Sequence, residues 1–199
     1  MRIVTARELE SWLEHGEVLE RDGRGPKVVR LESGLFLKIF HTRRHPLLAR
    51  LFPFAKRFAH NIELLHRLGI PAPEIVETFW IDRVRGLTGC QYRPLPGTPL
   101  ETLHRQAPQQ LRAALPELAS FIRVLHDKGI YFRSLHLGNI ILTPSGEFGL
   151  IDVLDLRKKS TPITRSLARR NFRHLENYLA RKKIKDFPLK QLVEAYESM

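Results

Sequence analysis

The sequence predicts an α+β protein with two lobes. Short β-rich runs fill the first half of the chain around one helical segment. Helical periodicity dominates the second half, where a single short hairpin interrupts the helices. A chain of 199 residues is long enough for one domain made of two small lobes. We therefore expect a single domain with an N-lobe at about residues 1–93 and a C-lobe at about residues 98–199.

The elements of the N-lobe follow from caps and turn signals. A T-x-x-E capping box at Thr5 predicts a helix over residues 6–15. The runs "EVLER", "KVVRLE" and "LFLKIF" come next, separated by the turn formers "DGRGP" and "SG", and predict an antiparallel three-stranded meander. Residues 45–69 are helical with a break near Pro53. Two more strands follow in "EIVETFWID" and "GLTGCQYRPL", which brings the expected number of strands to five.

The C-lobe is predicted from helical apolar stripes and one turn. A helix over residues 109–128 is expected because apolar residues recur there with helical spacing. That stripe consists of Leu111, Leu115, Leu118, Ile122 and Leu125. The segment "NIILTPSGEFGLID", residues 139–152, predicts a hairpin around Pro144 to Gly146. The tail is mostly helical, and its apolar stripe consists of Ala168, Phe172, Leu175 and Leu179.

The positive charge is concentrated near the end of the chain. The net charge is +12, and residues 157–185 hold eleven Lys and Arg against one acid, Glu176. Such a segment attracts phosphates on nucleic acid, anionic lipid or a phosphorylated glycan. The alternative is a solvated helix face that only keeps the protein soluble. A nucleic-acid partner is the least favoured, because only Phe172 and Tyr178 supply aromatic rings for base stacking.

Two further features bear on the compartment. The single cysteine, Cys90, cannot form an internal disulfide, which is typical of a reducing compartment. The N-terminal segment lacks the apolar core of a signal peptide, and no apolar run approaches the roughly 20 residues of a membrane span. We expect a cytoplasmic protein whose basic segment could make it peripheral at the inner membrane.

Lys38 is the first candidate site residue. In "LFLKIF" it shares a strand face with Phe36 and Phe40, an unusual setting for a lysine that has no partner. Glu63 is the candidate partner, because it is the only acid between Lys38 and Glu74. The alternatives are an edge-strand lysine and a surface glutamate that compensates neighbouring arginines.

Two loop regions complete the list of candidates. Gly23 and Gly25 could let backbone N–H groups approach phosphates, although simple hairpin geometry explains a two-glycine turn equally well. Asn139 and Asp152 stand at the two ends of the predicted hairpin, so their side chains should lie at the same end. Two oxygen ligands there suit Mg²⁺, which keeps waters and phosphate oxygens as its other ligands. The alternative is that Asn139 is a turn residue and Asp152 a cap.

The segments "FRSLHLGNII" and "GLID" resemble the protein-kinase-like superfamily. Their pattern is similar to H-x-D-x-H-x-x-N-I followed by a hairpin and I-D, as in its small bacterial branch. That branch contains lipopolysaccharide core (heptose/Kdo) kinases and proteins labelled as toluene-tolerance proteins. The resemblance spans about residues 17–183 and is most specific over residues 123–155. It implies a bilobal protein-kinase-like fold with a five-stranded antiparallel N-lobe sheet, one N-lobe helix and a reduced, mostly helical C-lobe.

The resemblance also assigns roles to residues. It implies that Lys38 contacts the phosphates of ATP and that Glu63 holds this lysine. It implies that Asn139 and Asp152 bind Mg²⁺. The segment from Tyr92 and Arg93 to Gly97 matches the hinge whose backbone faces the adenine.

The chain departs from the family pattern at its most reactive position. Ser134 replaces the catalytic aspartate, Phe132 replaces the usual histidine, and "DVL" lacks the glycine of D-F-G. A positioned base contributes only about 10²–10⁴-fold to such a reaction, so loss of the aspartate does not exclude catalysis. His136 or Asp155 could replace it. Equally, His136 could be a structural loop histidine, and Asp155 could pair with Arg157 or Lys158.

Two classes of function therefore remain open. The first is a kinase that phosphorylates a small molecule or glycan, such as a lipopolysaccharide-core sugar. The second is a pseudokinase that binds nucleotide and regulates or scaffolds a partner. Only 44 residues follow Asp155, too few for the peptide-docking helices of ordinary protein kinases, which favours a small or extended polar acceptor.

Overall fold

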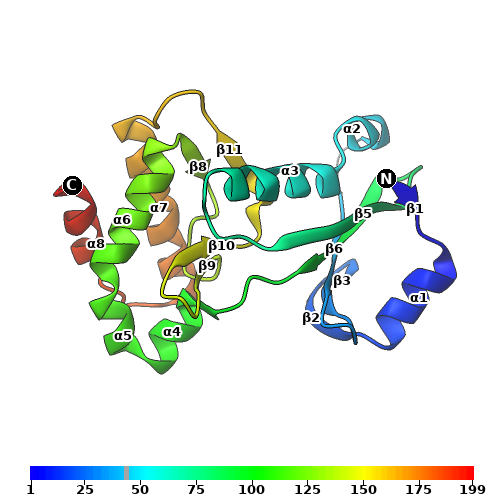
Figure 1. Ribbon diagram of the computed structural model, residues 1–199, viewed down its shortest axis with the longest axis horizontal. Coiled ribbons are helices and arrows are strands. Elements are labelled where there is room, and N and C mark those ends of the chain that lie inside the picture. Colours follow the sequence, from blue (N-terminus) through cyan, green and yellow to red (C-terminus); the bar gives the residue numbers. More distant parts are fainter. Residues whose placement is uncertain (43–44) are drawn as a thin grey trace. The chain divides into compact units, whose positions relative to one another are not determined.

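The computed structural model describes residues 1–42 and 45–199, and the chain folds as two compact units (Figure 1). The first unit consists of Met1–His66 with Ala72–Pro94, and the second of Arg67–Pro71 with Leu95–Met199. Strands dominate the first unit and helices the second. The α+β class predicted from the sequence is confirmed.

A six-stranded sheet forms the centre of the first unit, with the order β1-β5-β6-β4-β3-β2. Its strands are β1 (Arg2–Ile3), β2 (Glu17–Asp22), β3 (Gly25–Arg30), β4 (Phe36–Phe40), β5 (Glu74–Asp82) and β6 (Leu87–Arg93). The five predicted strands are all present and pair antiparallel. The strand number was wrong by one, because β1 adds a parallel edge strand to β5. Two residues are too few for alternation to reveal a strand.

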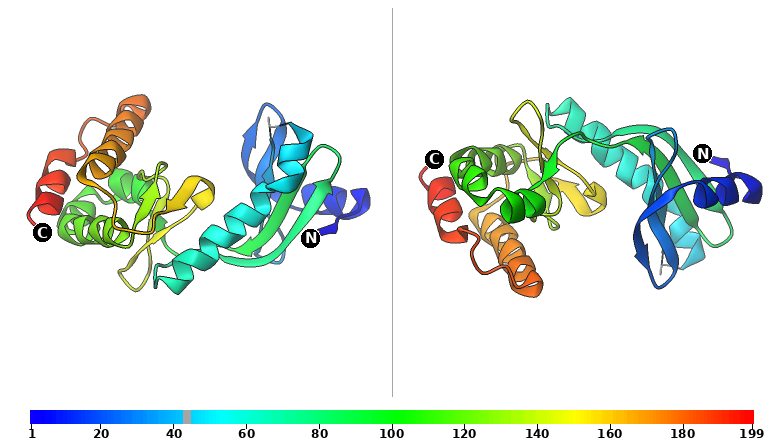
Figure 2. Two further views of the ribbon diagram at one scale, coloured as in Figure 1. Left: turned by 90° about the horizontal axis from the view of Figure 1, so that it is seen from above. Right: turned by 90° about the horizontal axis from the view of Figure 1, so that it is seen from below.

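Two helices cover opposite faces of this sheet (Figure 2). Helix α1 (Ala6–Glu14) begins at the predicted capping box, where the side chain of Thr5 accepts a hydrogen bond from the backbone of Glu8. Its apolar residues pack against the face that carries Leu37 and Ile39 of β4. Alternate residues of a strand point to opposite faces, so Lys38 lies on the other face, which α3 (Phe54–Arg67) covers.

The inserted helical segment is divided as predicted. Helix α2 (Pro46–Leu51) ends at Phe52, and α3 follows immediately after Pro53. Pro53 has no backbone N–H, so it cannot continue the hydrogen-bond ladder of α2. The backbone N–H of Phe52 still closes the last turn of α2 on Leu48 at 2.9 Å.

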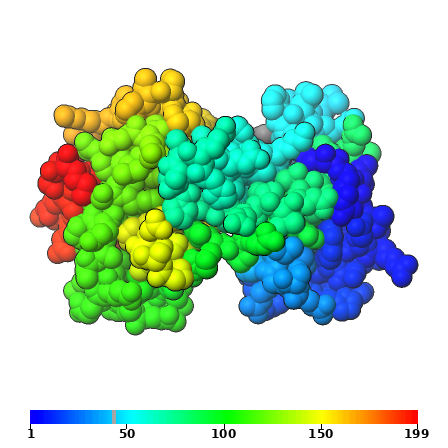
Figure 3. All heavy atoms as spheres, viewed as in Figure 1, coloured from blue at the N-terminus to red at the C-terminus, as the bar shows by residue number. Residues whose placement is uncertain are grey.

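The second unit is built from five α-helices around small sheets. They are α4 (Leu100–Gln106), α5 (Pro108–Ala113), α6 (Leu115–Asp127), α7 (Arg165–Lys182) and α8 (Leu189–Glu197). Helices α6 and α8 pack side by side, at the green and red end of Figure 3. The single helix predicted over residues 109–128 is wrong, because α5 ends at Ala113 and a new helix begins at Leu115, with Pro116 in its first turn. All five residues of its apolar stripe are nevertheless buried.

Short strands hold the loops of the second unit. The predicted hairpin is present as β9 (Ile140–Leu142) and β10 (Phe148–Leu150), and β9 also pairs with β7 (Thr98–Pro99). A second pair, β8 (Ile130–Phe132) with β11 (Leu156–Lys158), was not predicted. Between β10 and β11 lies a 3₁₀ turn, η1 (Val153–Asp155). Among the helices of the described residues, none has the length and apolar character of a membrane span.

Candidate active site

Lys38 occupies an aromatic setting in the first unit. It is only 8% exposed, on the middle of β4, where it is paired with Val28 on one side and Cys90 on the other. Its Nζ atom lies 5.5 Å from the ring centre of Phe58 and 6.0 Å from that of Phe40. Aromatic faces attract a cation at these distances. The two rings therefore form part of the surroundings of the ammonium group.

Glu63 does not lie beside this lysine. Its side chain belongs to the exposed face of α3, and it forms no ion pair with Lys38 in the described part of the chain. The face of α3 turned to the sheet instead presents Asn61, which is buried one helical turn after Phe58. The pairing of Lys38 with Glu63 stays a prediction that this structure does not display.

The turn that carries Gly23 and Gly25 is a tight hairpin. Asp22 of β2 is paired with Gly25 of β3, and its Oδ1 atom accepts a hydrogen bond from the backbone of Arg24 at 2.8 Å. This bond holds the pKa of the Asp22 carboxyl below its usual range. A glycine is required at position 25 because the backbone there has a φ of +124°, which other residues rarely adopt. The simple hairpin reading is thus sufficient, and contact with phosphate stays a prediction.

The predicted hinge residues lie at the end of β6 and behave differently. Tyr92 is buried, and its ring meets those of Phe36 at 5.7 Å and Phe58 at 6.0 Å in edge contacts. Arg93 is exposed and forms an ion pair with Glu74 at 3.4 Å. Tyr92 therefore contributes to the aromatic surroundings of Lys38, a role that the sequence did not indicate.

Asn139 and Asp152 meet at one end of the hairpin in the second unit. Ile140 is paired with Leu150, and just beyond this pair the backbone N–H of Ile151 donates to the carbonyl of Asn139 at 3.0 Å. Asp152 follows at once, in the left-handed conformation with φ +51°. Such a backbone is uncommon for a residue other than glycine and is often found at functional sites.

The side chain of Asn139 has a defined orientation. Its Nδ2 group donates to the carbonyl of Ser134 at 3.0 Å and faces Nε2 of His136 at 3.4 Å. Both N–H bonds of the amide are thereby directed at the loop, and its carbonyl oxygen Oδ1 remains for another partner. An amide oxygen next to an exposed carboxylate is a donor set that suits a hard cation.

Ser134 is bound to Asp155, the last residue of η1. The hydroxyl of Ser134 donates to Oδ2 of Asp155 at 2.7 Å, and Nε of Arg133 lies 3.4 Å from the same oxygen. The other oxygen, Oδ1, is buried and has no hydrogen-bond partner in the part of the chain that the structure describes. The expected pairing of Asp155 with Arg157 or Lys158 is wrong, because these residues lie further along β11.

His136 is held by an aromatic ring. It stacks on Tyr178 with ring centres 4.1 Å apart, and the hydroxyl of Tyr178 donates to Glu101 at 2.5 Å. Burial lowers the pKa of His136, and the cation of Arg181 lowers it further. The Nδ1 atom of His136 is buried without a hydrogen-bond partner among the described residues, and its Nε2 atom faces the side chain of Asn139 and not a backbone group.

Sequence reasoning missed the support that Tyr178 and Glu101 give to this loop. Glu101 also pairs with Lys182 at 3.2 Å, and the bond from Tyr178 lowers the pKa of its carboxyl. Gly138 passes close to both side chains, since a Cβ atom there would lie 3.2 Å from the Tyr178 hydroxyl. No local pattern could have revealed these contacts, because Glu101 and Tyr178 are 77 positions apart.

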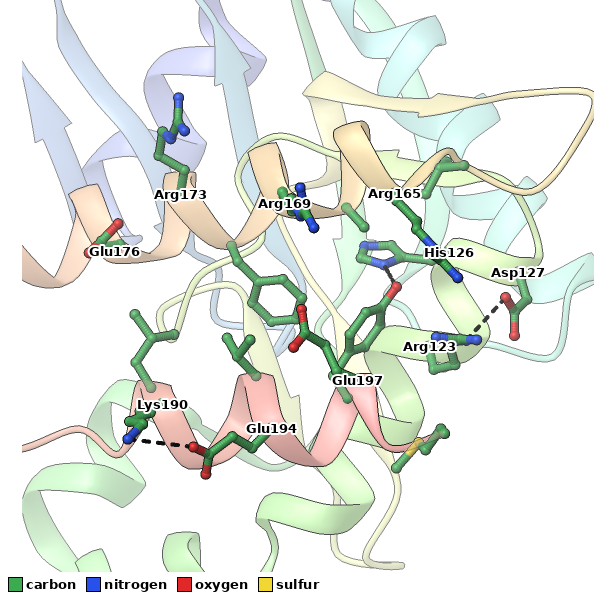
Figure 4. A pocket seen from close by; sticks show the side chains of 17 residues that line it. Arg123, His126, Asp127, Arg165, Arg169, Arg173, Glu176, Lys190, Glu194 and Glu197 are labelled. Carbon is green, nitrogen blue, oxygen red and sulfur yellow. Dashed lines mark hydrogen bonds and ion pairs between the residues drawn. The ribbon is translucent and has the colours of Figure 1, made fainter.

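A second feature of this unit is a groove of about 1250 Å³ between α6, α7 and α8, which we call the α7–α8 groove (Figure 4). Arg165, Arg169 and Arg173 line it from successive turns of α7. Two residues of the predicted apolar stripe of α7, Ala168 and Phe172, also line the groove, and Leu175 of the same stripe is buried. Two other cations of the lining are paired at the distances of ion pairs, Arg123 with Asp127 and Lys190 with Glu194.

A buried polar network lies beneath the groove. The side chain of Asn171 donates to the carbonyl of Phe132 at 2.6 Å, so its Oδ1 faces Nε2 of His126, 3.3 Å away. His126 Nε2 must then carry the proton, and its Nδ1 accepts from the hydroxyl of Tyr196 at 2.8 Å. Burial lowers the pKa of His126 to about 4. The network thus links α8 to the strand that leads into Ser134.

Comparison with known proteins gives the class of the chain. The sequence pattern of the phosphotransferase enzyme family matches residues 19–129, which is more than half of the chain. The matched segment includes Lys38 and Tyr92 and ends shortly before the loop that carries Ser134. Among curated proteins, no match to the chain is found. The buried lysine of β4 and the polar hairpin end are thus parts of a kinase-like protein, and the chain belongs to the phosphotransferase enzyme family.

Proposed function

We propose that this protein is a kinase that transfers the γ-phosphoryl group of ATP to a hydroxyl of a polar glycan, of the class of lipopolysaccharide-core sugars. One observation carries the proposal: the hairpin end brings Asn139 and Asp152 beside the loop of Ser134. Phosphoryl transfer needs little more than positioned charges around the phosphates and a group near the acceptor hydroxyl. The second unit offers both within a few residues.

The donor set at the hairpin end fits Mg²⁺. Asn139 would supply its amide oxygen and Asp152 its carboxylate, and Mg²⁺ commonly binds one or two such groups together with substrate phosphates. No group of three or more His, Cys, Asp or Glu that could hold a metal occurs among the described residues. A cation held by two protein ligands would complete its coordination with water and with the phosphates of the nucleotide, whose charge it would neutralise. In the first unit, the ammonium group of Lys38 is proposed to contact nucleotide phosphate, as the resemblance to kinases implies.

Nucleotide binding is tested by thermal shift with Mg-ATP on the whole protein. We expect Mg-ATP to raise the melting temperature of the wild type, and Asp152→Asn to abolish that rise. Asp127→Asn is the matched control, because it removes the same charge from the end of α6 and should leave the rise intact. Without a rise in the wild type, both the kinase and the nucleotide-binding pseudokinase are excluded.

Turnover separates the kinase from the pseudokinase. We expect ADP to form slowly from Mg-ATP, and faster when a dephosphorylated lipopolysaccharide-core oligosaccharide is added. Binding of Mg-ATP without ADP formation under any of these conditions would favour the pseudokinase, in which Ser134 marks the loss of catalysis.

We further propose that the arginines of the α7–α8 groove bring the protein to an anionic membrane surface. Arg165, Arg169 and Arg173 are exposed, follow one another at every fourth residue and form no ion pair among the described residues. Two acids of the groove, Glu176 and Glu197, temper this charge locally. The wider segment over residues 157–185 nevertheless keeps an excess of ten positive charges, from eleven cations and one acid.

Vesicle binding tests this contact. We expect the protein to bind phosphatidylcholine vesicles only when they contain phosphatidylglycerol, with roughly 1 kcal/mol lost for each arginine replaced by glutamine. The control replaces Arg7, Arg50 and Arg83, which are also exposed but lie in the first unit. If both triple variants lose the same amount of vesicle binding, the binding depends on the net charge of the protein and not on the arginines of the α7–α8 groove.

A further inference from the structure

We propose that Ser134 and Asp155 act together as a proton relay that replaces the missing catalytic aspartate, an inference that rests on the proposed kinase function. Ser134 stands where the kinase-like pattern has its carboxylate, and a carboxylate is present one hydrogen bond behind it. Asp155 Oδ2 accepts the hydroxyl proton of Ser134 at 2.7 Å. In this protein the carboxylate would be supplied by η1 and not by the loop of Ser134.

The contact is fixed by the backbone on both sides. Strand β11 pairs with β8, and Leu156 lies opposite Phe132, so the positions of Asp155 and Arg133 come next in the same register. The side chain of Asn171 binds the carbonyl of Phe132 at 2.6 Å and holds β8 in place. Ser134 and Asp155 are therefore set by a strand pair, although each lies in a loop or a turn.

The hydrogen bonding of Asp155 is incomplete in a way that structure alone does not explain. Its side chain is 23% exposed, yet its Oδ1 atom is buried and has no partner in the described chain. A buried acceptor without a donor costs on the order of 1–3 kcal/mol. Native structures seldom keep such a group without a functional reason.

The relay satisfies the chemistry of phosphoryl transfer. The acceptor oxygen forms a bond to the γ-phosphorus while the bond from that phosphorus to the β–γ bridging oxygen breaks, which leaves ADP. The acceptor proton moves to Oγ of Ser134 as the proton of Ser134 moves to Oδ2 of Asp155. Asp155 later returns this proton to solvent. Ser134 touches the reacting hydroxyl, and Asp155 is a positioning residue that acts through it.

The test measures ADP formation from Mg-ATP in single turnovers with water as the acceptor, beside the thermal shift that reports binding. Asp155→Asn keeps the shape of the side chain and Ser134→Ala keeps the backbone pairing. We expect each to slow the reaction roughly 10²–10⁴-fold while the Mg-ATP shift is unchanged. The double variant should be no slower than either single one, because the two residues act as a unit.

Rescue distinguishes a relay from a structural contact. Ser134→Asp alone places two carboxylates in contact, so we expect mutual repulsion to limit its rate. Combining Ser134→Asp with Asp155→Asn removes the repulsion and restores a direct base, and should reach at least the wild-type rate. Glu147→Gln is the matched control, since Glu147 also accepts from a serine hydroxyl, that of Ser145 at 3.0 Å. It should leave the rate unchanged.

The outcomes separate this inference from the proposed function. If Asp155→Asn turns over as fast as the wild type, the relay is wrong and nucleotide binding can still stand. The relay is also wrong, and nucleotide binding can still stand, if the wild type binds Mg-ATP but forms ADP no faster than the Ser134→Ala variant. Absence of any Mg-ATP shift in the wild type overturns both the relay and the kinase.

Discussion

Lys38 and Ser134, the central polar residues of the two units, differ in the groups that surround them. Lys38 is surrounded by the rings of Phe40 and Phe58 and is buried in a sheet. Ser134 is held by hydrogen bonds to Asp155 and, through its carbonyl, to Asn139. Aromatic rings form much of the surroundings of the lysine, whereas hydrogen bonds between loops surround the serine.

The comparison indicates where stability and reactivity reside. Packed aromatic side chains contribute several kcal/mol each to the stability of the fold when they are buried. The polar loop leaves His136 and Asp155 each with a buried atom that has no partner among the described residues. Groups of this kind lower stability and are typical of functional sites. We therefore expect substitutions near Lys38 to affect folding more than substitutions near Ser134.

The largest effect is expected from Phe58→Ala. The ring of Phe58 is 1% exposed and contacts those of Phe40 and Tyr92 at 5.4 Å and 6.0 Å. Its removal should lower the free energy of unfolding by about 3–5 kcal/mol, through lost burial and an unfilled cavity. Urea denaturation followed by circular dichroism measures this change.

Two controls sharpen this result. Phe52, at the end of α2, is 65% exposed, so Phe52→Ala should change the free energy by no more than about 0.5 kcal/mol. Ser134→Ala should likewise cost less than Phe58→Ala. A larger loss of stability for Ser134→Ala than for Phe58→Ala would contradict the expectation that residues near Lys38 contribute more to folding than residues near Ser134.

The next largest effect is expected from acid, which should destabilise the second unit more than the first. The pKa of His126 falls to about 4 in the folded protein, mainly through burial, against about 6.5 in the unfolded chain. Between these values the unfolded state binds the proton, so stability is lost as pH falls from about 6.5 towards 4. We expect a loss of about 2 kcal/mol between pH 7.5 and pH 5. Hydrogen exchange should show it in α6 and α8 first.

The variant that checks this assignment is His126→Gln. It removes the titrating group, so its free energy of unfolding should depend less on pH over the same range by that amount. If the wild type and His126→Gln lose stability in parallel on acidification, carboxylates and not His126 cause the loss. The first unit should be affected less, because Lys38, Asn61 and Thr88 are its buried polar residues in the described chain.

Much of the fold could be predicted because its signals are local. The β-rich runs between turn formers predicted strands β2 to β6, the capping box predicted α1, and turn residues predicted the β9–β10 hairpin. The strand β1 and the pair β8–β11 escaped, since two or three residues carry no period. The break between α5 and α6 was signalled by Pro116 but was overridden by an apolar stripe that continues across it.

The site was predicted less completely because its contacts are distant in sequence. Asn139 and Asp152 could be placed together, since a hairpin connects them. Glu63 was chosen because it is the only negative charge in its segment. The helical period nevertheless places Asn61, and not Glu63, on the buried face of α3 with Phe58 and Ile62. The bond between Ser134 and Asp155 depends on the β8–β11 pair and could not be read locally.

The smallest effect on stability concerns the glycine turn of the first unit, and it decides whether that turn has a function. A Cβ atom at Gly23 would meet nothing within 4 Å, so Gly23→Ala should change the free energy of unfolding by about 0.5 kcal/mol or less. Gly25 has φ +124°, and Gly25→Ala should cost about 1 kcal/mol through backbone strain alone. Any loss of the Mg-ATP thermal shift in Gly23→Ala would therefore report a clash with bound phosphate and not a change of fold. An unchanged shift would leave the turn a hairpin without a role in phosphate binding.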